Sequence, residues 1–214
     1  MSLVLVRELR EKTGAGLVDC QKALAEASGD VDKALRVLRE KGLAKAAKKS
    51  TRVATDGMVG SYIHPGGKIG VLIEVNCETD FVAKTDEFQA LVKDLAMQVA
   101  AAAPRYLTRE EVPAEELESE RAIYRKQAEA TGKPAQVIER IVDGQVERYY
   151  KDVCLLEQAF VKQSDRTIGD LVKEAIIRFG VNVAVRRFAR FQLGETQARA
   201  GEAKEDAAGG TAGA

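Results

Sequence analysis

Hydrophobic residues recur at helical spacing through the N-terminal part of the chain. Apolar positions repeat every three or four residues in 3–13, 17–27 and 31–42, and turn or glycine residues close each run. Asp30 stands just before the third run, where its side chain can accept backbone N–H groups. The pattern predicts a bundle of three short helices in which Gly42 ends the third, followed by a separate basic linker helix over 43–53.

From Asp56 the apolar period changes from helical to alternating. Residues 58–63 alternate, the turn His64-Pro65-Gly66-Gly67 follows, and a second β-rich run covers 69–75. Two such runs around a Pro-Gly-Gly turn indicate a β-hairpin. The β-branched and aromatic run 181–193 predicts a third strand, so the sheet is completed from far along the chain.

Several helices are predicted between the second and third strands. A strong amphipathic stripe ends before Pro104 and consists of Phe88, Leu91, Val92, Leu95 and Val99. Two further helical stretches, 113–130 and 137–146, are separated by Gly132-Lys133-Pro134 and predict a helical hairpin. A last helix is predicted over 167–180.

Together these elements predict an α+β protein with two domains. Residues 1–54 are expected to form the three-helix module with its linker helix. Residues 55–194 are expected to form the core, which consists of a three-stranded antiparallel sheet, packed helices and the helical hairpin. Residues 195–214 contain alanine as their only apolar type and are predicted to be a disordered tail.

Charge and composition argue against several kinds of partner. Lys+Arg and Asp+Glu both number 33, so the net charge is zero, whereas domains that neutralise nucleic-acid phosphates usually run strongly basic. The lack of Trp and an aromatic content of 5% argue against a platform for stacking bases. The apolar start before Arg7 is too short for a secretory signal, and no stretch approaches the ~18 apolar residues of a membrane span. A cytoplasmic protein without membrane or direct nucleic-acid partners is expected.

Candidate chemistry is sparse. The three cysteines, Cys20, Cys77 and Cys154, are scattered, and His64 is the single histidine, so no metal site, cofactor or acid–base cluster is expected. The chain is therefore predicted not to be an enzyme. Cys154 has two open interpretations, as a small buried apolar residue or as a contact in a dimer interface.

The segment 74–83 places a large apolar ring at the end of a predicted strand. Phe81 stands where the strand gives way to a helix, and Asp80 stands beside it. One interpretation is that Thr79 or Asp80 caps the helix while Phe81 belongs to the core. The other is that Asp80 and Phe81 face a partner protein, and spacing alone leaves both open.

Two segments resemble the bacterial elongation factor Ts family. They are ELREKTGAGLVDCQKALAEASGDVDKALRVLREKG, residues 8–42, and EVNCETDFVAK, residues 74–84. The resemblance extends over about residues 3–193. It implies a nucleotide exchange factor for the GTPase elongation factor Tu, with a ubiquitin-associated-like N-terminal module and no cofactor of its own.

The resemblance also implies which residues meet the partner. In this family the N-terminal module docks on the partner's G domain, and the matching positions here are Arg10, Leu17 and Val18. The segment associated with dislodging the partner's magnesium ion corresponds to Thr79, Asp80, Phe81 and Val82. Of these, Asp80 and Phe81 are the positions that the resemblance assigns most firmly.

Two departures from the family pattern affect these expectations. Many members have two core subdomains in tandem, whereas a single sheet-containing unit is predicted here, with no second hairpin resembling residues 56–76. Short members are expected to recover the tandem arrangement by forming a homodimer. Leu17 and Val18 stand where some relatives have bulkier methionines, so the resemblance does not fix those contacts.

Three other functions stay open at this point. An adaptor that used only the ubiquitin-associated-like module would not require the segment 74–84. An RNA-binding protein would use the basic clusters 45–52 and 186–190 with an affinity that falls steeply with salt, but zero net charge and the acidic stretch 110–120 weigh against it. A nucleotidase would need a GxxxxGK[ST] loop and a general base, and the sequence shows neither.

Overall fold

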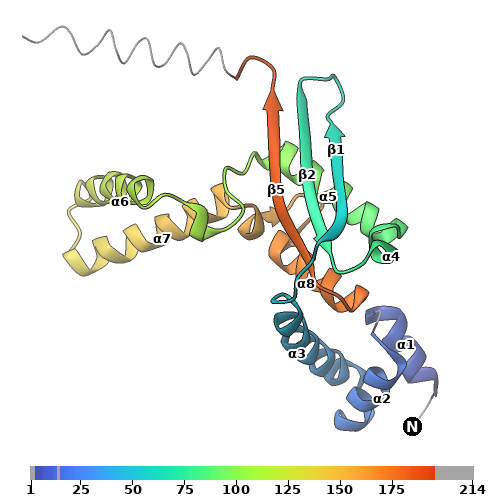
Figure 1. Ribbon diagram of the computed structural model, residues 1–214. Coiled ribbons are helices and arrows are strands. Elements are labelled where there is room, and N and C mark those ends of the chain that lie inside the picture. Colours follow the sequence, from blue (N-terminus) through green and yellow to red (C-terminus); the bar gives the residue numbers. More distant parts are fainter. Residues whose placement is uncertain (1–2, 14, 196–214) are drawn as a thin grey trace, which may run out of the picture.

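A computed structural model describes residues 3–13 and 15–195 of the chain. It contains a helical bundle, a core built on a sheet, and a helical arm that projects from the core (Figure 1). This architecture confirms the predicted α+β fold. From residue 196 on, the predicted disordered tail lies outside the described residues.

The helices and strands follow the predicted order. The bundle consists of α1 (Leu3–Thr13), α2 (Leu17–Glu26) and α3 (Val31–Lys49). The core consists of β1 (Asp56–Ile63), β2 (Ile69–Cys77), β5 (Val183–Gln192), α4 (Asp80–Ala83), α5 (Asp86–Ala102) and α8 (Ile168–Phe179). The arm consists of α6 (Ala114–Glu129) and α7 (Ala135–Val153), flanked by the 3₁₀ turns η1 (Arg109–Glu111) and η2 (Leu155–Glu157). A short ribbon that the apolar pattern does not predict precedes α8 and consists of β3 (Ala159–Phe160) and β4 (Gln163–Thr167).

The bundle has a small apolar core of its own. A cluster of buried residues joins the three helices and consists of Val6, Leu9, Cys20, Ala23, Leu24, Ala27 and Ala34. Asp30 caps α3, because its side chain accepts a hydrogen bond from the backbone N–H of Lys33 at 3.0 Å. The predicted three-helix module and its cap are confirmed.

The predicted helix end at Gly42 is wrong. α3 runs without a break from Val31 to Lys49, so the predicted linker helix is the C-terminal half of α3. Gly42 is buried, and a Cβ atom at this position would lie only 2.9 Å from Cδ1 of Ile177 on α8. The glycine therefore lets two helices approach closely instead of ending one of them.

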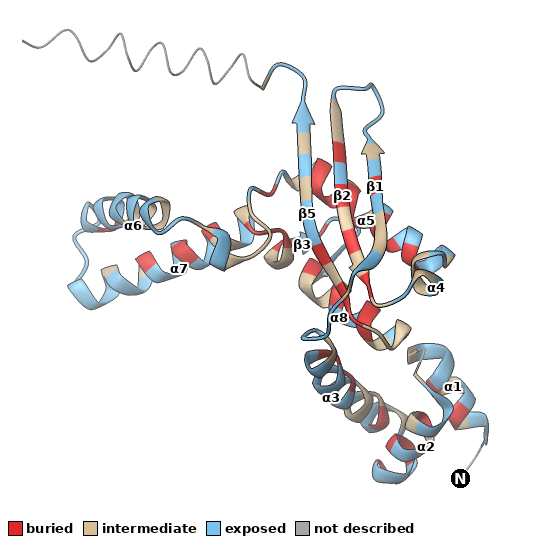
Figure 2. Ribbon diagram, viewed as in Figure 1, coloured by how far each residue is buried: buried red, intermediate tan, exposed pale blue. Residues whose placement is uncertain are grey.

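β2 is the central strand of the sheet. The strand order is β1-β2-β5 and both pairs are antiparallel, which confirms the predicted hairpin and the late third strand. α5 packs on the sheet and α8 packs against β5, and the buried residues lie where the helices meet the strands (Figure 2). The predicted stripe of α5 is buried in full, at Phe88, Leu91, Val92, Leu95 and Val99.

A β-bulge divides β5 into two halves. The register with β2 shifts at Arg186, which has no partner on the neighbouring strand. Before the bulge Val183 and Val185 are buried against the helices. After it Phe188 packs on the core and Arg190 donates a hydrogen bond to a backbone carbonyl of α5. The bulge explains why arginine and apolar residues do not alternate regularly in this strand.

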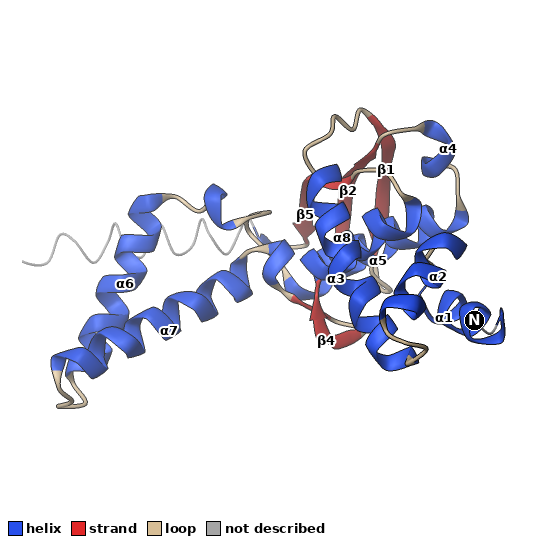
Figure 3. Ribbon diagram, turned by 90° about the horizontal axis from the view of Figure 1, so that it is seen from below, coloured by secondary structure: helices blue, strands red, loops and turns tan. Residues whose placement is uncertain are grey.

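The arm is an antiparallel pair of helices, as predicted from the two helical stretches on either side of Gly132-Lys133-Pro134. α6 and α7 pack on each other and extend away from the core (Figure 3). At the base of the arm Glu116 accepts hydrogen bonds from the hydroxyl groups of Tyr106, at 2.6 Å, and Tyr149, and from Arg105 at 2.8 Å. The hydrogen bond from Tyr106 is the main cause that lowers the pKa of Glu116, so the carboxylate that fixes the arm is ionised at neutral pH.

One buried polar side chain joins α5 to the segment after the arm. Gln98 is fully buried, and its Nε2 donates to Oε1 of Gln158 and to the carbonyl of Ala159, both at 3.1 Å. Its Oε1 accepts from the backbone N–H of Val161 at 2.9 Å. Both ends of the amide are thus paired, and α5 holds the segment from η2 to β3 by hydrogen bonds as well as by packing.

Gln98→Leu is expected to lower the free energy of unfolding by about 2–4 kcal/mol, because it leaves the buried Oε1 of Gln158 and two part-buried backbone groups, the carbonyl of Ala159 and the N–H of Val161, without these hydrogen bonds. Gln127→Leu, at an exposed position of α6, is the matched control and should change that free energy by less than about 0.5 kcal/mol. Urea unfolding followed by circular dichroism measures both. Equal unfolding free energies for the two variants would contradict the role of this hydrogen-bond network.

Candidate functional site

A short turn between β2 and α5 carries the predicted partner-binding segment. β2 ends at Cys77, α4 is a single helical turn, and α5 begins at Asp86. Thr79 occupies the N-cap position of α4, but its side chain makes no capping hydrogen bond. The hydroxyl of Thr79 therefore does not cap this helix, and the turn depends on other contacts.

Phe81 points out of the turn into solvent. The residue is 80% exposed, whereas its neighbours Val82 and Ala83 pack against the core. The interpretation of Phe81 as a core residue is therefore wrong. Leaving such a ring in water forfeits roughly 1.5–3 kcal/mol that burial would provide, and contact with a second protein can recover this free energy.

Hydrogen bonds on both sides hold the turn in place. The buried thiol of Cys77 donates to the carbonyl of Thr79 at 3.1 Å. Burial raises the pKa of this thiol, so it stays protonated and able to donate at neutral pH. The hydroxyl of Thr85 donates to the carbonyl of Val82 at 2.8 Å and accepts from the backbone N–H of Phe88, which caps α5. The exposed ring is thus carried by a fixed corner of the core.

Asp80 forms an ion pair within the same turn. Its carboxylate lies 2.7 Å from Nζ of Lys84. The hydrogen bond between them lowers the pKa of Asp80 and raises the pKa of Lys84, so both groups are charged at neutral pH. Because both side chains are largely exposed, the pair is weak and can be exchanged for charges on a partner.

The second predicted contact lies on the bundle. Arg10 is exposed on α1, and Leu17 and Val18 are exposed in the first turn of α2. Leu3 and Val4 of α1 are exposed as well, and the apolar pattern does not assign them to a partner surface. Exposed apolar side chains on both helices are typical of a protein-binding surface.

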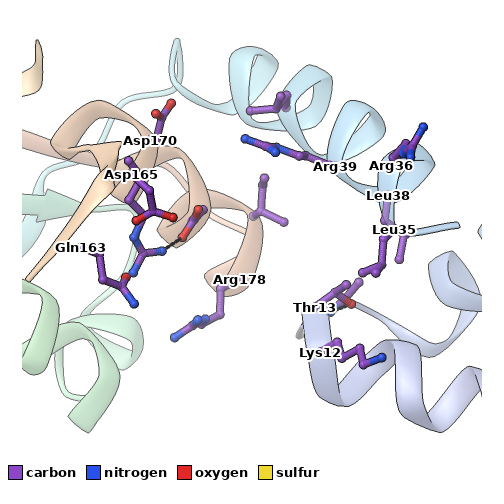
Figure 4. Close-up of a pocket in the computed structure, with 15 residues that line it drawn as sticks. Lys12, Thr13, Leu35, Arg36, Leu38, Arg39, Gln163, Asp165, Asp170 and Arg178 are labelled. Carbon is purple, nitrogen blue, oxygen red and sulfur yellow. Dashed lines mark hydrogen bonds and ion pairs between the residues drawn. The ribbon is translucent and has the colours of Figure 1, made fainter. Parts of the chain in front are cut away.

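The structure does not bring the two predicted contact regions together in one pocket. α4 belongs to the core and α1 and α2 belong to the bundle, and all three lie on the side of the core away from the arm (Figures 1 and 3). A cleft of about 750 Å³ separates bundle from core, with Arg36 and Arg39 of α3 on one wall and Arg178 of α8 on the other (Figure 4). A partner that touches both regions must therefore bind a broad surface.

The cysteine and histidine candidates do not form a chemical site. Cys154 is fully buried within the chain, which confirms its interpretation as a small buried residue. The other interpretation, that Cys154 contacts a second protomer directly, is wrong. Burial raises the pKa of this thiol to about 11. His64 is exposed in the turn between β1 and β2. Within residues 3–13 and 15–195 no three His, Cys, Asp or Glu side chains are grouped so that they could hold a metal ion.

None of the helices in the described ranges combines the length and the apolar character needed to cross a membrane.

The outer face of the sheet, opposite the packed helices, is exposed and partly apolar. Its exposed large apolar residues are Val59 and Ile63 of β1, Leu72 of β2 and Phe191 of β5. Nearer the bulge, Glu74 and Arg187 form an ion pair of 2.7 Å on the same face. The residue pattern does not indicate this surface, because strand alternation alone does not tell which face another chain covers.

The fold and its exposed apolar groups define a protein that acts by binding another protein. A family model described as "Elongation factor TS" matches residues 18–195. Elongation factor Ts of Carboxydothermus hydrogenoformans is 58% identical over 195 residues, which cover 91% of this chain and 90% of the relative. The protein of the same name from Geobacter sulfurreducens is 60% identical over 190 residues, covering 89% and 88% of the two chains. The chain belongs to the elongation factor Ts family.

This family membership defines the activity. Elongation factor Ts is the nucleotide exchange factor for elongation factor Tu in translation elongation, and it is not an enzyme. The predicted exchange function, partner and cytoplasmic location are thereby confirmed. The exchange factor is selected over the adaptor, the RNA-binding protein and the nucleotidase.

Phe81→Ala is expected to change the free energy of unfolding by less than about 0.5 kcal/mol, because the lost ring makes few contacts within its own chain. Phe88→Ala is the matched control, since Phe88 is 0% exposed and the loss of a buried ring costs about 3–5 kcal/mol. Denaturant unfolding of the two variants measures this difference. A loss of similar size in both would mean that Phe81 is packed against its own protein.

Proposed function

We propose that Phe81, presented with Asp80 on α4, is the group that disturbs the magnesium and phosphate site of elongation factor Tu and so releases GDP. The observation that supports this is the exposure of the ring on a fixed corner of the core. A GTPase holds GDP through phosphate-cradling backbone groups and a magnesium ion with strict octahedral geometry. A ring inserted among the groups that support this ion weakens its coordination. Thr79, which is exposed, and the accessible part of Val82 lie in the same turn and complete the proposed contact.

The free energies involved require more than one contact. The exchange factor and GDP lower each other's affinity for the partner by the same factor, as linkage requires. Accelerating release ~1000-fold corresponds to about 4 kcal/mol. A single aromatic hot spot contributes ~2–4 kcal/mol and reaches this total only at the upper end of that range. A second surface that holds the factor on its partner while the ring is inserted supplies the rest.

The bundle supplies this second surface. Arg10, Leu17 and Val18 are exposed there, and we propose that they bind the G domain of elongation factor Tu. The chain accordingly works as two domains, a docking module over residues 1–54 and an exchange core over residues 55–194.

Phe81→Ala is expected to slow the release of fluorescent GDP from elongation factor Tu by ~10–100-fold at a saturating concentration of the factor, because the ring is the inserted hot spot. Ile123→Ala is the control, since it removes an exposed apolar side chain from α6, on the arm. It should leave the release rate unchanged. Stopped-flow fluorescence measures both, and wild-type release by Phe81→Ala would refute the proposed role.

We also propose that the protein forms a homodimer through the outer face of its sheet. Val59, Ile63, Leu72 and Phe191 are exposed together there, and such a patch favours burial against another protein surface. A second copy is the favoured occupant because residues 3–13 and 15–195 contain a single core built on the three-stranded sheet, whereas many members of the family have two such subdomains. A two-fold axis through the face buries the apolar residues of both protomers at once.

Phe191→Asp is expected to convert the dimer to a monomer, because it places an unpaired charge in an apolar interface. Ile123→Asp introduces the same charge at an exposed apolar position of the arm and should leave the dimer intact. Light scattering and sedimentation velocity give the molar mass of each variant. A monomeric wild-type protein, or a dimeric Phe191→Asp variant, would contradict this interface.

A further inference from the structure

Glu78 stands three residues before Phe81 and joins the turn to two distant segments of the chain. Its Oε1 accepts a hydrogen bond from the backbone N–H of Asn182 at 2.5 Å, across 104 positions of sequence. Its Oε2 lies 3.5 Å from Nη1 of Arg52. Asn182 precedes β5 and Arg52 follows α3, so three segments meet beside the turn that carries the ring.

Asn182 completes this junction from its buried position. Its Nδ2 donates to the carbonyl of Arg52 at 2.7 Å and to the carbonyl of Ser50 at 3.3 Å. Its Oδ1 is also buried and has no hydrogen-bond partner among the residues that the structure describes. A leucine of similar size would avoid the cost of that oxygen, but it would leave two carbonyls after α3 unpaired. The contribution of the side chain here is therefore its two donated hydrogen bonds.

Other contacts fix the end of α3 to the same corner. Nζ of Lys49 donates to the carbonyl of Gly180 in the turn before β5, and Ala46 is buried in the main core. On the side of the bundle, Nζ of Lys45 lies 3.0 Å from the carboxylate of Asp19 on α2. α3 thus runs from the bundle to the corner that carries Phe81, while the cleft separates the two bodies elsewhere.

We propose that Glu78 and Asn182 form a clasp that sets the position of Phe81 relative to the bundle, which makes Glu78 a positioning residue for nucleotide exchange. The inference rests on the proposed role of Phe81. When the bundle and the ring engage one partner together, the ring enters only if the distance between the two contacts is correct. A displacement of about 1 Å of a group that must be placed in this way can cost up to ~100-fold in rate.

Of the two contacts that Glu78 makes, the hydrogen bond from the backbone N–H of Asn182 contributes more than the ion pair with Arg52. The ion pair with Arg52 is longer, and the Arg52 side chain is more than half exposed, so its contribution to stability is small. Glu78→Gln keeps an oxygen that can accept from Asn182 and loses the charge toward Arg52. Glu78→Ala loses both, which makes the two variants a graded pair.

The test measures the rate of fluorescent-GDP release from elongation factor Tu against the concentration of each variant. Glu78→Ala is expected to lower the plateau rate by about ten-fold, while the half-saturating concentration changes by less than about two-fold, because the bundle still docks. Glu78→Gln should restore most of the plateau. Glu139→Ala, which breaks a 3.0 Å pair with Arg125 on the arm, is the control and should match the wild type. A Glu78→Ala plateau equal to that of the wild type would overturn the clasp.

A double variant separates positioning from a general loss of stability. Because Glu78 acts through the ring, Phe81→Ala combined with Glu78→Ala should release GDP no more than about two-fold slower than Phe81→Ala alone. If the reductions in release rate caused by Phe81→Ala and by Glu78→Ala multiply in the double variant, the inference is overturned. If Phe81→Ala is slow and Glu78→Ala is not, the clasp fails while the proposed function stands. If Phe81→Ala itself has the wild-type rate, the proposed function and the clasp fail together.

Should Glu78→Ala fail to fold, Asn182→Ala carries the same test, because it removes the two donated bonds and keeps the backbone N–H. It is expected to lower the plateau rate by several-fold, with the half-saturating concentration unchanged. A wild-type plateau for this variant would overturn the clasp in the same way.

Discussion

The double pairing of β2 is the constraint on which the exchange surface depends. This strand is hydrogen-bonded to β1 on one side and to β5 on the other, and its inward side chains Val71, Ile73 and Val75 are buried under the helices. A strand held in this way cannot shift without breaking two ladders and uncovering the core. The residues that follow it therefore leave the sheet at a defined point and in a defined direction. That is why a turn of only a few residues can hold an exposed phenylalanine steadily enough to act on another protein.

The same constraint explains how two separate contact regions can work together. The bundle has its own apolar core and is separated from the main core by a cleft, so it could act as an independent module. α3 prevents this, because its C-terminal half packs on α8 and its end is tied to the segment before β5. The free energy needed for exchange is at the upper limit of what one ring supplies, and a rigid connection lets docking at the bundle favour insertion at Phe81.

Much of the fold follows from the sequence, since apolar spacing fixes which face of each helix and strand is buried. The stripe on α5 and the hairpin around His64 are examples, and both are local patterns. The end of α3 could not be predicted from the sequence, because a glycine that stops a helix and a glycine that allows close packing look the same there. The residue that packs against Gly42 in space, Ile177, lies far along the chain. The exposure of Phe81 does not follow from spacing either, because a ring at the end of a strand has the same local signal whether its own core or a partner covers it. The hydrogen bond between Glu78 and Asn182 spans 104 positions, so no local pattern contains it. The one sequence signal is Asn182 itself, a polar residue within the otherwise apolar run 181–185.

The most direct measurement compares wild-type protein and Phe81→Ala in the release of GDP from elongation factor Tu, with magnesium present and with magnesium chelated. If the ring acts by weakening the ion's coordination, the release rate with the wild type divided by the rate with Phe81→Ala is large while magnesium is bound. The same ratio falls to about three or less when magnesium has already been removed. An advantage of the same size under both conditions would mean that Phe81 does not act on the magnesium site.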